Sequence, residues 1–515
     1  MESEFIIEML GITKEFGKLK ANNNITLQLK KGEILALVGE NGAGKSTLMS
    51  ILFGMYAPSK GEIRKNGKRV KIESPNDANK LHIGMVHQHF KLVECFSLLD
   101  NIILGDEPTQ GLFISRDEAR KKVMSISAKY GLAINPDAIV RDVTVGMQQR
   151  AEILKMLYRD NEVLIFDEPT AVLTPQETAE LMGIIKSLAK EGKSIIFITH
   201  KLNEVFTVSD RITVIRRGEH IATLNTKDTN VEEISSLMVG RNIEFTPQKK
   251  DTRPGENVLK VENLSVIDKE TKKATLDNVS FVVRKGEILG IAGVDGNGQR
   301  ELVYALTGLL NQSSGKIFLA GQDISAASIK TRNKHGISHI PEDRLKHGLV
   351  LDYRLEQNLV LQRYDEKEFQ KFGFIKSENV RNYAKYLTQK FDVRSSDGVL
   401  ATARSMSGGN QQKAIIAREI DRYHDLLIAV QPTRGVDIGA IEFIHRELVK
   451  ERDKGKGVLL VSLDLDEILA LSDRILVMYE GKFVGEFSPK HTTHEELGLY
   501  MAGGKRKDVS SEVLK

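Results

Sequence analysis

The stretch GENGAGKST, residues 39–47, fits the spacing G-x-x-x-x-G-K-S through Gly39, Gly44, Lys45 and Ser46. A short apolar run, EILALVG, leads into it and apolar residues at helical spacing follow it, which predicts a strand, a glycine loop and a helix. Glycines let backbone N–H groups close around phosphate oxygens, and the start of a helix adds the positive end of its dipole. The sequence therefore predicts a phosphate-binding loop formed by Gly39, Glu40, Asn41, Gly42, Ala43, Gly44, Lys45, Ser46 and Thr47.

A second group of candidate residues closes the apolar run EVLIFDEP, residues 162–169. Such a run is typical of a parallel strand buried on both faces, and ligands of such sheets bind beyond the carboxyl ends of the strands. We expect Asp167 and the hydroxyl of Ser46 to hold Mg²⁺. Glu168 would polarise the attacking water, and Lys45 would neutralise charge on the β- and γ-phosphates. The alternatives are a glycine turn without a ligand and a solvated acidic loop.

The chain contains this pattern twice. KGEILALVGENGAGKSTL from Lys31 matches KGEILGIAGVDGNGQREL from Lys285, an offset of 254 residues, and SDRITVIRRGE around Asp210 matches SDRILVMYEGK around Asp473, an offset of 263. A repeat of this length indicates two homologous domains and not a short-period solenoid. The polar stretch between the copies, with two prolines, reads as a linker. The predicted organisation is a first domain at 1–243, a linker at 244–256, a second domain at 257–505 and a tail at 506–515.

Composition narrows the class of protein. Hydrophobic residues make up 41% and charged residues 28% of the 515 residues, and the net charge of +4 is too small to favour a nucleic-acid binder. The single cysteine, Cys95, excludes an intramolecular disulfide and a multi-cysteine metal site. The N-terminus lacks a signal-peptide pattern and no apolar run reaches the length of a membrane span, so we expect a chain that does not itself cross a membrane.

Four stretches together resemble the nucleotide-binding subunits of ABC transporters: GENGAGKST, VLIFDEPTAVLTPQE, IIFITH and MSGGNQQK. The resemblance covers nearly the whole chain. It implies an α/β fold with two tandem P-loop ABC-type ATPase domains, each with a mainly parallel sheet core, an antiparallel β part and a helical subdomain. It also implies that the chain binds ATP and Mg²⁺ and couples ATP hydrolysis to transport.

The resemblance also assigns residues that spacing alone does not. It implies that Gln88 serves both catalysis and Mg²⁺ binding, that His200 is the switch histidine and that Phe16 stacks on adenine. A position in the hydrophobic core is the alternative for Phe16. The resemblance further implies that the two domains pair head to tail within the chain, so that ATP on the first loop also meets the signature of the second half. The signature residues are Ser407, Gly408, Gly409 and Gln411.

The second half has lost the groups that would handle phosphate, magnesium and water. Gln299 and Arg300 stand where the first half has its lysine and serine. The other replaced residues are Asp167 by Val430, Glu168 by Gln431, His200 by Leu463, Gln88 by Glu342 and Phe16 by Glu270.

The signatures show the reverse asymmetry. The second half keeps SGGNQ, whereas the first half reads TVGMQ, with Thr144 and Val145 in place of serine and glycine. Valine has neither the backbone freedom of glycine nor its close approach to a phosphate. Under head-to-tail pairing the intact loop meets the intact signature. The sequence therefore predicts one competent ATP site and one degenerate site.

A tandem pair without a membrane segment would obtain its pore from other chains. PEDR (341–344) and QPTRGVDIGA (431–440) resemble the ATP-binding subunits of importers for simple sugars and nucleosides, and VGMQQRAEILKMLYR (145–159) resembles the nucleoside branch. This implies two membrane permease subunits that contact the segments after Gln88 and Glu342. It also implies an extracytoplasmic or lipid-anchored substrate-binding protein, no nucleic acid, and a peripheral position at the cytoplasmic face of the cell membrane.

Two alternatives to nucleoside import stay open. The same machine could carry a simple sugar such as ribose or galactose. More remotely, the chain could be a soluble tandem ABC ATPase that acts on ribosomes or DNA. Relatives of that kind carry two complete catalytic sets, long charged linkers, zinc cysteines or long coiled coils, whereas this sequence has one catalytic set, a short linker and one cysteine.

Overall fold

The computed structural model describes residues 4–17, 19–86, 91–111, 113–170, 175–199, 201–242, 247–250, 253–268 and 272–507. The chain divides into two compact units, Met1–Ile243 (unit 1) and Glu244–Lys515 (unit 2). Among the described residues, none of the helices combines the length and the apolar character that a membrane span requires.

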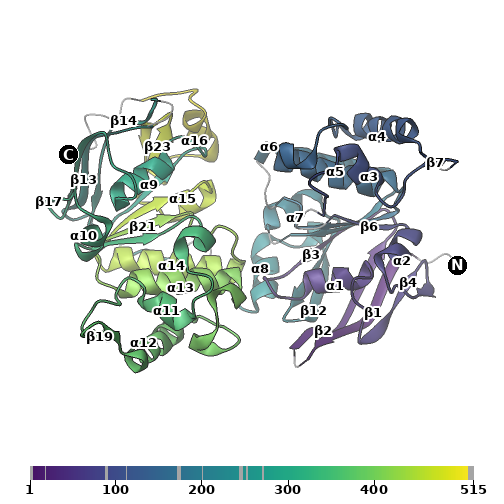
Figure 1. Ribbon diagram of the computed structural model, residues 1–515, viewed down its shortest axis with the longest axis horizontal. Helices are drawn as coiled ribbons and strands as arrows, with labels where there is room; N and C mark the ends of the chain where they lie inside the picture. Colours follow the sequence, from purple (N-terminus) through teal and green to yellow (C-terminus); the bar gives the residue numbers. More distant parts are fainter. Residues whose placement is uncertain are drawn as a thin grey trace. The chain divides into compact units, whose positions relative to one another are not determined.

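Unit 1 contains two larger β-sheets (Figure 1). The six-stranded sheet is parallel except for its edge strand β12, which pairs antiparallel with β11. Its strands, in spatial order, are β12 (Glu219–Asn225), β11 (Arg211–Arg216), β3 (Ile34–Val38), β10 (Ser194–Ile198), β9 (Val163–Asp167) and β6 (Ile83–Val86). The antiparallel sheet has the order β2 (Leu19–Lys30), β1 (Phe5–Phe16), β4 (Lys60–Lys65) and β5 (Lys68–Val70).

Helices lie on both sides of the six-stranded sheet of unit 1: α1 and α2 lie with the antiparallel sheet, and α3 to α6 cover the opposite side. Figure 1 shows α3, α4 and α5 on that side, and β1, β2 and β4 on the other. The helices are α1 (Lys45–Leu52), α2 (Pro75–Lys80), α3 (Leu98–Ile103), α4 (Arg116–Tyr130), α5 (Val145–Tyr158), α6 (Pro175–Lys190), α7 (Leu202–Val208) and α8 (Val231–Val239). A small hairpin of β7 (Thr109–Gln110) and β8 (Phe113–Ile114) precedes α4.

Successive residues of the central strands enter two different hydrophobic cores. In β9, Val163 and Ile165 pack with α1 and the antiparallel sheet, whereas Leu164 and Phe166 pack with the helices α3 to α6. Because side chains alternate across a strand, a strand between two cores has to be apolar at every position. This explains the continuous apolar run that precedes Asp167.

Unit 2 repeats this architecture strand for strand. Its six-stranded sheet has the order β18 (Ile337–Ile340), β21 (Leu426–Val430), β22 (Gly457–Val461), β15 (Ile288–Ala292), β23 (Arg474–Tyr479) and β24 (Lys482–Phe487), again with only the last strand antiparallel. Its antiparallel sheet has the order β14 (Ala274–Arg284), β13 (Asn257–Ile267), β16 (Ser314–Leu319) and β17 (Gln322–Asp323).

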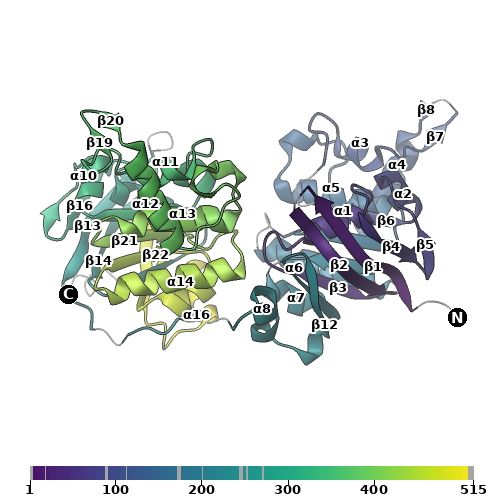
Figure 2. The same cartoon turned by 90° about the horizontal axis from the view of Figure 1, so that it is seen from below.

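The helices of unit 2 take the corresponding places, and Figure 2 shows α13 and α14 lying across β21 and β22. They are α9 (Gln299–Thr307), α10 (Ile329–Lys334), α11 (Leu355–Val360), α12 (Ser377–Lys390), α13 (Gly408–Asp421), α14 (Ile438–Asp453), α15 (Leu465–Leu471) and α16 (His494–Met501). A hairpin of β19 (Gln370–Lys371) and β20 (Phe374–Ile375) precedes α12, as β7 and β8 precede α4. The predicted α/β fold with two parallel sheet cores, antiparallel β parts and helical subdomains is confirmed.

The described part of the predicted linker is attached to unit 2. Lys249 donates from its ammonium to the carbonyl of Ser472 at 2.8 Å and pairs with Asp473 at 3.5 Å. The guanidinium of Arg452 bonds the carbonyl of Lys250 at 2.7 Å. Polar contacts therefore hold this part of the predicted linker against unit 2, and Pro247 beside it is buried.

Candidate functional site

The predicted phosphate loop joins β3 to α1. Gly42 and Gly44 have φ values of 83° and 100°, a left-handed region that side chains with a Cβ rarely adopt. A Cβ on Gly44 would lie 2.6 Å from the side-chain nitrogen of Asn22 and would also press on the carbonyl of Ala21. The loop therefore requires glycine at this point. Its backbone encloses the start of α1, where the N–H groups of the first turn point along the helix axis and the helix dipole favours an anion.

Lys45 begins α1 and folds back over the loop. Its side chain is buried, and its ammonium donates to the carbonyls of Gly39 at 2.7 Å and Glu40 at 3.0 Å. These contacts hold a positive charge inside the loop that the backbone forms. The structure thus brings the predicted loop residues, from Gly39 to Thr47, together at one strand end and helix start.

Ser46 and Asp167 meet beside this loop. The Ser46 hydroxyl donates a long hydrogen bond of 3.4 Å to Oδ1 of Asp167, which ends β9. Burial raises the pKa of the Asp167 carboxyl to about 6, because it disfavours the charged form, although the bond from Ser46 lowers it. Two of the three predicted Mg²⁺ ligands therefore lie together. The third, Gln88, lies outside the described residues.

Glu168 follows Asp167 in a left-handed backbone conformation, with φ at 48°. Its N–H donates to the carbonyl of Ile198 at 2.9 Å, which ties the strand end of β9 to that of β10. The predicted general base is therefore fixed at the end of the sheet, directly after the buried Asp167. His200, the predicted switch histidine, lies outside the described residues.

Phe16 lies at the end of β1 and is 42% exposed, so the interpretation as a core residue does not hold. Its ring packs edge to face with Tyr56, with centroids 5.4 Å apart and an interplanar angle of 79°. The Lys14 ammonium lies 5.1 Å from the centroid of the Phe16 ring. A partly exposed aromatic ring beside a cation suits a flat, anionic ligand, and the role in stacking stays a prediction.

The signature of the second half forms the start of α13. Ser407 caps this helix and accepts hydrogen bonds from the backbone and side-chain amides of Asn410. A Cβ on Gly408 would lie 2.7 Å from Nη2 of Arg344, and a Cβ on Gly409 would lie 3.2 Å from the Asp437 carboxylate. A side chain at Gly408 would therefore require the end of the Arg344 side chain to move, and one at Gly409 would require a smaller shift of Asp437.

Gln411 differs from the other signature residues. Its side chain is buried, and its amide donates to the carbonyl of Ala403 at 2.9 Å. In unit 2 taken by itself, this side chain supports the turn that precedes the signature. Its predicted contact with the nucleotide stays untested.

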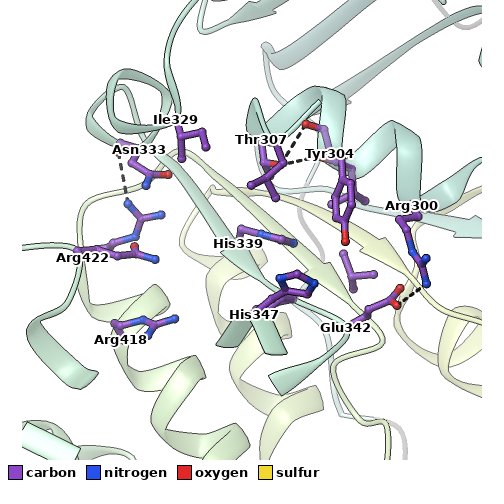
Figure 3. Close-up of a pocket in the computed structure, with 15 residues that line it drawn as sticks. Arg300, Tyr304, Thr307, Ile329, Asn333, His339, Glu342, His347, Arg418 and Arg422 are labelled. Atoms are coloured by element: carbon purple, nitrogen blue, oxygen red, sulfur yellow. Dashed lines mark hydrogen bonds and ion pairs between the residues drawn. The ribbon is translucent and has the colours of Figure 1, made fainter. Parts of the chain in front are cut away.

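The loop of unit 2 keeps its backbone and changes its chemistry. Gly296 and Gly298 have φ values of 88° and 107°, close to those of their counterparts in unit 1. Gln299 is buried at the lysine position and donates from Nε2 to the carbonyl of Val294 at 3.1 Å. Arg300, at the serine position, forms an ion pair of 3.0 Å with Glu342, and the close-up shows this contact (Figure 3).

A cavity of about 230 Å³ lies beside this ion pair in unit 2. Figure 3 shows Tyr304, His339 and His347 among the side chains around it. Burial lowers the pKa of His339 to about 4, so this imidazole is neutral near pH 7. The Glu342 carboxylate raises the pKa of Arg300, which stays charged.

Sequence reasoning missed a buried network behind both strand ends. In unit 1, Oε2 of Glu204 accepts hydrogen bonds from Thr170 at 2.8 Å and from Thr199 at 3.1 Å. In unit 2, Thr433 donates to Glu467 at 2.9 Å. The offset of 263 residues relates Thr170 to Thr433 and Glu204 to Glu467. The identity of these residues in both halves is the feature of the sequence that could have revealed the network.

Comparisons with known proteins agree with this geometry. The model of the ABC transporter family matches residues 22–171 and 276–434, one match in each unit. The guanosine import ATP-binding protein NupO of Bacillus subtilis is 54% identical over 98% of this chain and 99% of its own length. The nucleoside import ATP-binding protein NupA of Lactococcus lactis is 52% identical over 98% of this chain and 99% of its own length.

A solved structure of an RNase-L inhibitor aligns with 96% of this chain and with 92% of its own length, with a TM-score of 0.62 and 19% identity. At this identity the similarity shows the fold alone. ABC ATPase domains bind ATP, generally with Mg²⁺. With one such domain in each half, and with close relatives along its whole length, the chain belongs to the ABC transporter family as one of its tandem ATP-binding, ATP-hydrolysing chains.

Proposed function

We propose that the chain is the ATP-binding and ATP-hydrolysing subunit of an importer for nucleosides. The observation that carries this proposal is the identity of 54% and 52%, over almost the whole chain, to two ATP-binding proteins named for guanosine and nucleoside import. The loop around Lys45 and the buried Asp167 provide the chemistry that such a subunit needs. The division into domains at 1–243 and 257–505, with a linker at 244–256 and a tail at 506–515, is part of the proposal.

The residues of unit 1 fit ATP with Mg²⁺. Ser46 and Asp167 provide two oxygen atoms in contact, and these residues would hold the metal together with Gln88. Bound Mg²⁺ would neutralise charge on the phosphates. Lys45 would leave its two carbonyl partners for the β- and γ-phosphates, while Glu168 would accept a proton from the attacking water. His200 would orient that water, and Phe16 would hold the base.

The second nucleotide site would be degenerate. Gln299, Arg300 and Val430 offer neither the lysine nor the oxygen ligands of the first site. Under the proposed head-to-tail pairing, the first loop meets Ser407, Gly408, Gly409 and Gln411. This pairing is supported by the distribution of the intact residues: the complete loop and the complete signature lie in opposite halves.

The chain would work as a clamp on membrane partners. Two permease subunits would provide the pore and contact the segments after Gln88 and Glu342, and an extracytoplasmic or lipid-anchored protein would deliver the nucleoside. The chain would lie peripherally at the cytoplasmic face of the membrane. ATP at the competent site would favour the closed clamp because the closed state binds it more tightly, and hydrolysis would reopen it.

Uptake of labelled nucleosides, compared with labelled pentoses and hexoses, tests this proposal. Cells that lack the chain are supplied with the intact chain or with Glu168→Gln. We expect only the intact chain to restore nucleoside uptake. Restored uptake of a sugar instead would show that the importer carries a simple sugar. A change in growth or translation without a change in uptake would contradict the proposal that the chain serves an importer.

A further inference from the structure

The second loop does not offer a magnesium site. At the first loop the hydroxyl of Ser46 lies 3.4 Å from the Asp167 carboxyl, and both are oxygen ligands of the kind that Mg²⁺ takes. The same two positions of unit 2 hold Arg300 and Val430. A guanidinium has no lone pair for a metal and repels a cation, and a valine side chain has no ligand atom. The residues of the second loop therefore do not fit a divalent metal.

The phosphate cradle itself persists in unit 2. Gly296 and Gly298 have φ values of 88° and 107°, against 83° and 100° for Gly42 and Gly44. A Cβ on Gly298 would lie 2.7 Å from the carbonyl of Thr275, so glycine is required here too. The backbone thus keeps the loop and the helix start that favour phosphate oxygens, while the hydroxyl and the carboxyl that meet at the first loop are absent. The third predicted ligand position holds Glu342, whose carboxylate pairs with Arg300.

In unit 2 a positively charged side chain, Arg300, occupies the position of the predicted metal ligand Ser46. Arg300 lies in the first turn of α9, and its side chain is 53% exposed beside the loop. One contact, from Nη2 to Oε1 of Glu342 at 3.0 Å, positions the guanidinium. A guanidinium carries five N–H donors in a plane that matches phosphate geometry, so this single bond leaves its capacity for an anion largely intact.

The charges at the ends of β9 and β21 also differ between the two units. Asp167 and Glu168 place two carboxyl groups beside the first loop, and a divalent cation is needed to bring phosphates near them. Val430 and Gln431, their counterparts, are neutral. The loop of unit 2 itself contains Asp295, which together with Glu342 acts on the Arg300 guanidinium, and only Glu342 is paired with it directly. Unit 2 therefore has fewer carboxyl groups at its strand end but still one in the loop.

We propose that the second loop binds the phosphates of a nucleoside di- or triphosphate without a divalent metal, with Arg300 as the cation and Glu342 as the residue that positions it. The proposal rests on the chain being an ATP-binding subunit. It assigns to unit 2 a binding site that stays occupied when magnesium is removed, in contrast to the site in unit 1.

Equilibrium dialysis of the full chain with labelled ATP, in Mg²⁺ or in excess EDTA, tests this assignment. We expect two bound nucleotides per chain in Mg²⁺ and one in EDTA. Lys45→Ala should remove the magnesium-dependent nucleotide and leave the EDTA-resistant one. Arg300→Ala should weaken the EDTA-resistant site by about tenfold or more, because a charge-assisted contact is lost, and Arg300→Lys should weaken it less.

Two further variants separate a ligand contact from a structural effect. Arg300→Gln keeps a polar side chain with N–H donors and removes its charge, and it should match Arg300→Ala with an unchanged melting temperature. Lys330→Ala removes another exposed cation of unit 2, paired with Asp365 at 2.6 Å, and should bind as the unaltered chain does. EDTA-resistant binding that survives Arg300→Ala and Arg300→Gln would overturn the role of Arg300.

Counting bound Mn²⁺ by electron paramagnetic resonance gives an independent readout. At saturating ATP we expect one bound Mn²⁺ per chain, and a second one when Arg300→Ser and Val430→Asp restore the ligands of unit 1. Two Mn²⁺ in the unaltered chain, or no EDTA-resistant ATP in Lys45→Ala, would overturn the metal-free site. Failure of the proposed function would give a different result: the unaltered chain would then show no magnesium-dependent ATP binding for Lys45→Ala to remove.

Discussion

The two phosphate loops share a backbone and differ in their side chains. Gly44 and Gly298, with φ values of 100° and 107°, occupy equivalent positions before equivalent helices. Yet the buried residue that follows is Lys45 in one loop and Gln299 in the other. The shape of such a loop is set by glycines and by the packing of strand and helix, so it is kept where the lysine and the serine are replaced.

The residues that follow β9 and β21 also share their backbone conformation and differ in their side chains. Glu168 and Gln431 have φ values of 48° and 46°, and each donates its N–H to the carbonyl that ends the neighbouring strand, at 2.9 and 2.8 Å. The Thr170–Glu204 bond has its counterpart in Thr433–Glu467. Scaffold contacts are therefore common to both units, and the two positions differ in their side chains, a carboxyl in unit 1 and an amide in unit 2.

The largest expected difference between the units concerns this base. Glu168→Gln should lower ATP turnover by about 10³-fold, because it removes the group that accepts a proton from water. Gln431→Ala, at the equivalent position of unit 2, should change turnover by less than about twofold. Phosphate release by the chain assembled with its permeases measures both. Equal losses in the two variants would break the comparison.

The second largest expected effect on turnover comes from exchanging residues between the two signatures. Gly408→Val copies the first half's signature into the second, brings a Cβ to within 2.7 Å of Arg344 and should lower turnover by about 10²-fold through loss of anion contacts. Val145→Gly makes the reverse change in the first half and should leave turnover nearly unaltered. The same phosphate-release assay applies. A stronger effect of Val145→Gly than of Gly408→Val would show that the loops and signatures pair differently.

Asp167 predicts a pH dependence of magnesium binding at the first site. Its pKa, raised by burial to about 6, means that the carboxyl is charged above pH 7 and increasingly protonated below pH 6. The apparent Mg²⁺ affinity should therefore fall by up to about tenfold per pH unit below pH 6. Magnesium titrations of ATP binding from pH 5 to 8 measure this.

Asp167→Asn serves as the reference for that titration, because nucleotide phosphates titrate as well. The variant should bind Mg²⁺ more weakly at every pH and show only the pH dependence of the nucleotide. If the unaltered chain and Asp167→Asn show the same slope between pH 5 and 7, Asp167 does not hold the metal.

The smallest effect concerns the base of the nucleotide. Phe16→Ala should raise the KM for ATP by about five- to tenfold and leave kcat unchanged, because stacking contributes to binding and not to the chemical step. Leu19→Ala, which removes an exposed apolar side chain paired with Phe16 across the strands, is the matched control. An unchanged KM in Phe16→Ala would remove this residue from the site.

Much of the fold was predictable from the sequence because its signals are local. Glycine spacing and apolar runs such as the one before Asp167 are read from neighbouring residues, and the two-domain repeat is read by aligning such stretches at two constant offsets. The contact between Arg300 and Glu342 was not predicted, although each replacement was noted, because 42 residues separate them and only the folded sheet brings them together. The burial of Gln411 and the anchoring of Lys249 also depend on packing that no local pattern encodes.

Turnover by Lys45→Ala and by Gln299→Ala, measured side by side in the assembled importer, tests most directly whether one unit carries the hydrolysis. Lys45 holds the only ammonium at either loop position, whereas Gln299 bonds the backbone of its own loop. We predict that Lys45→Ala abolishes turnover and that Gln299→Ala keeps most of it. Comparable losses from both substitutions would show two working sites and contradict the account.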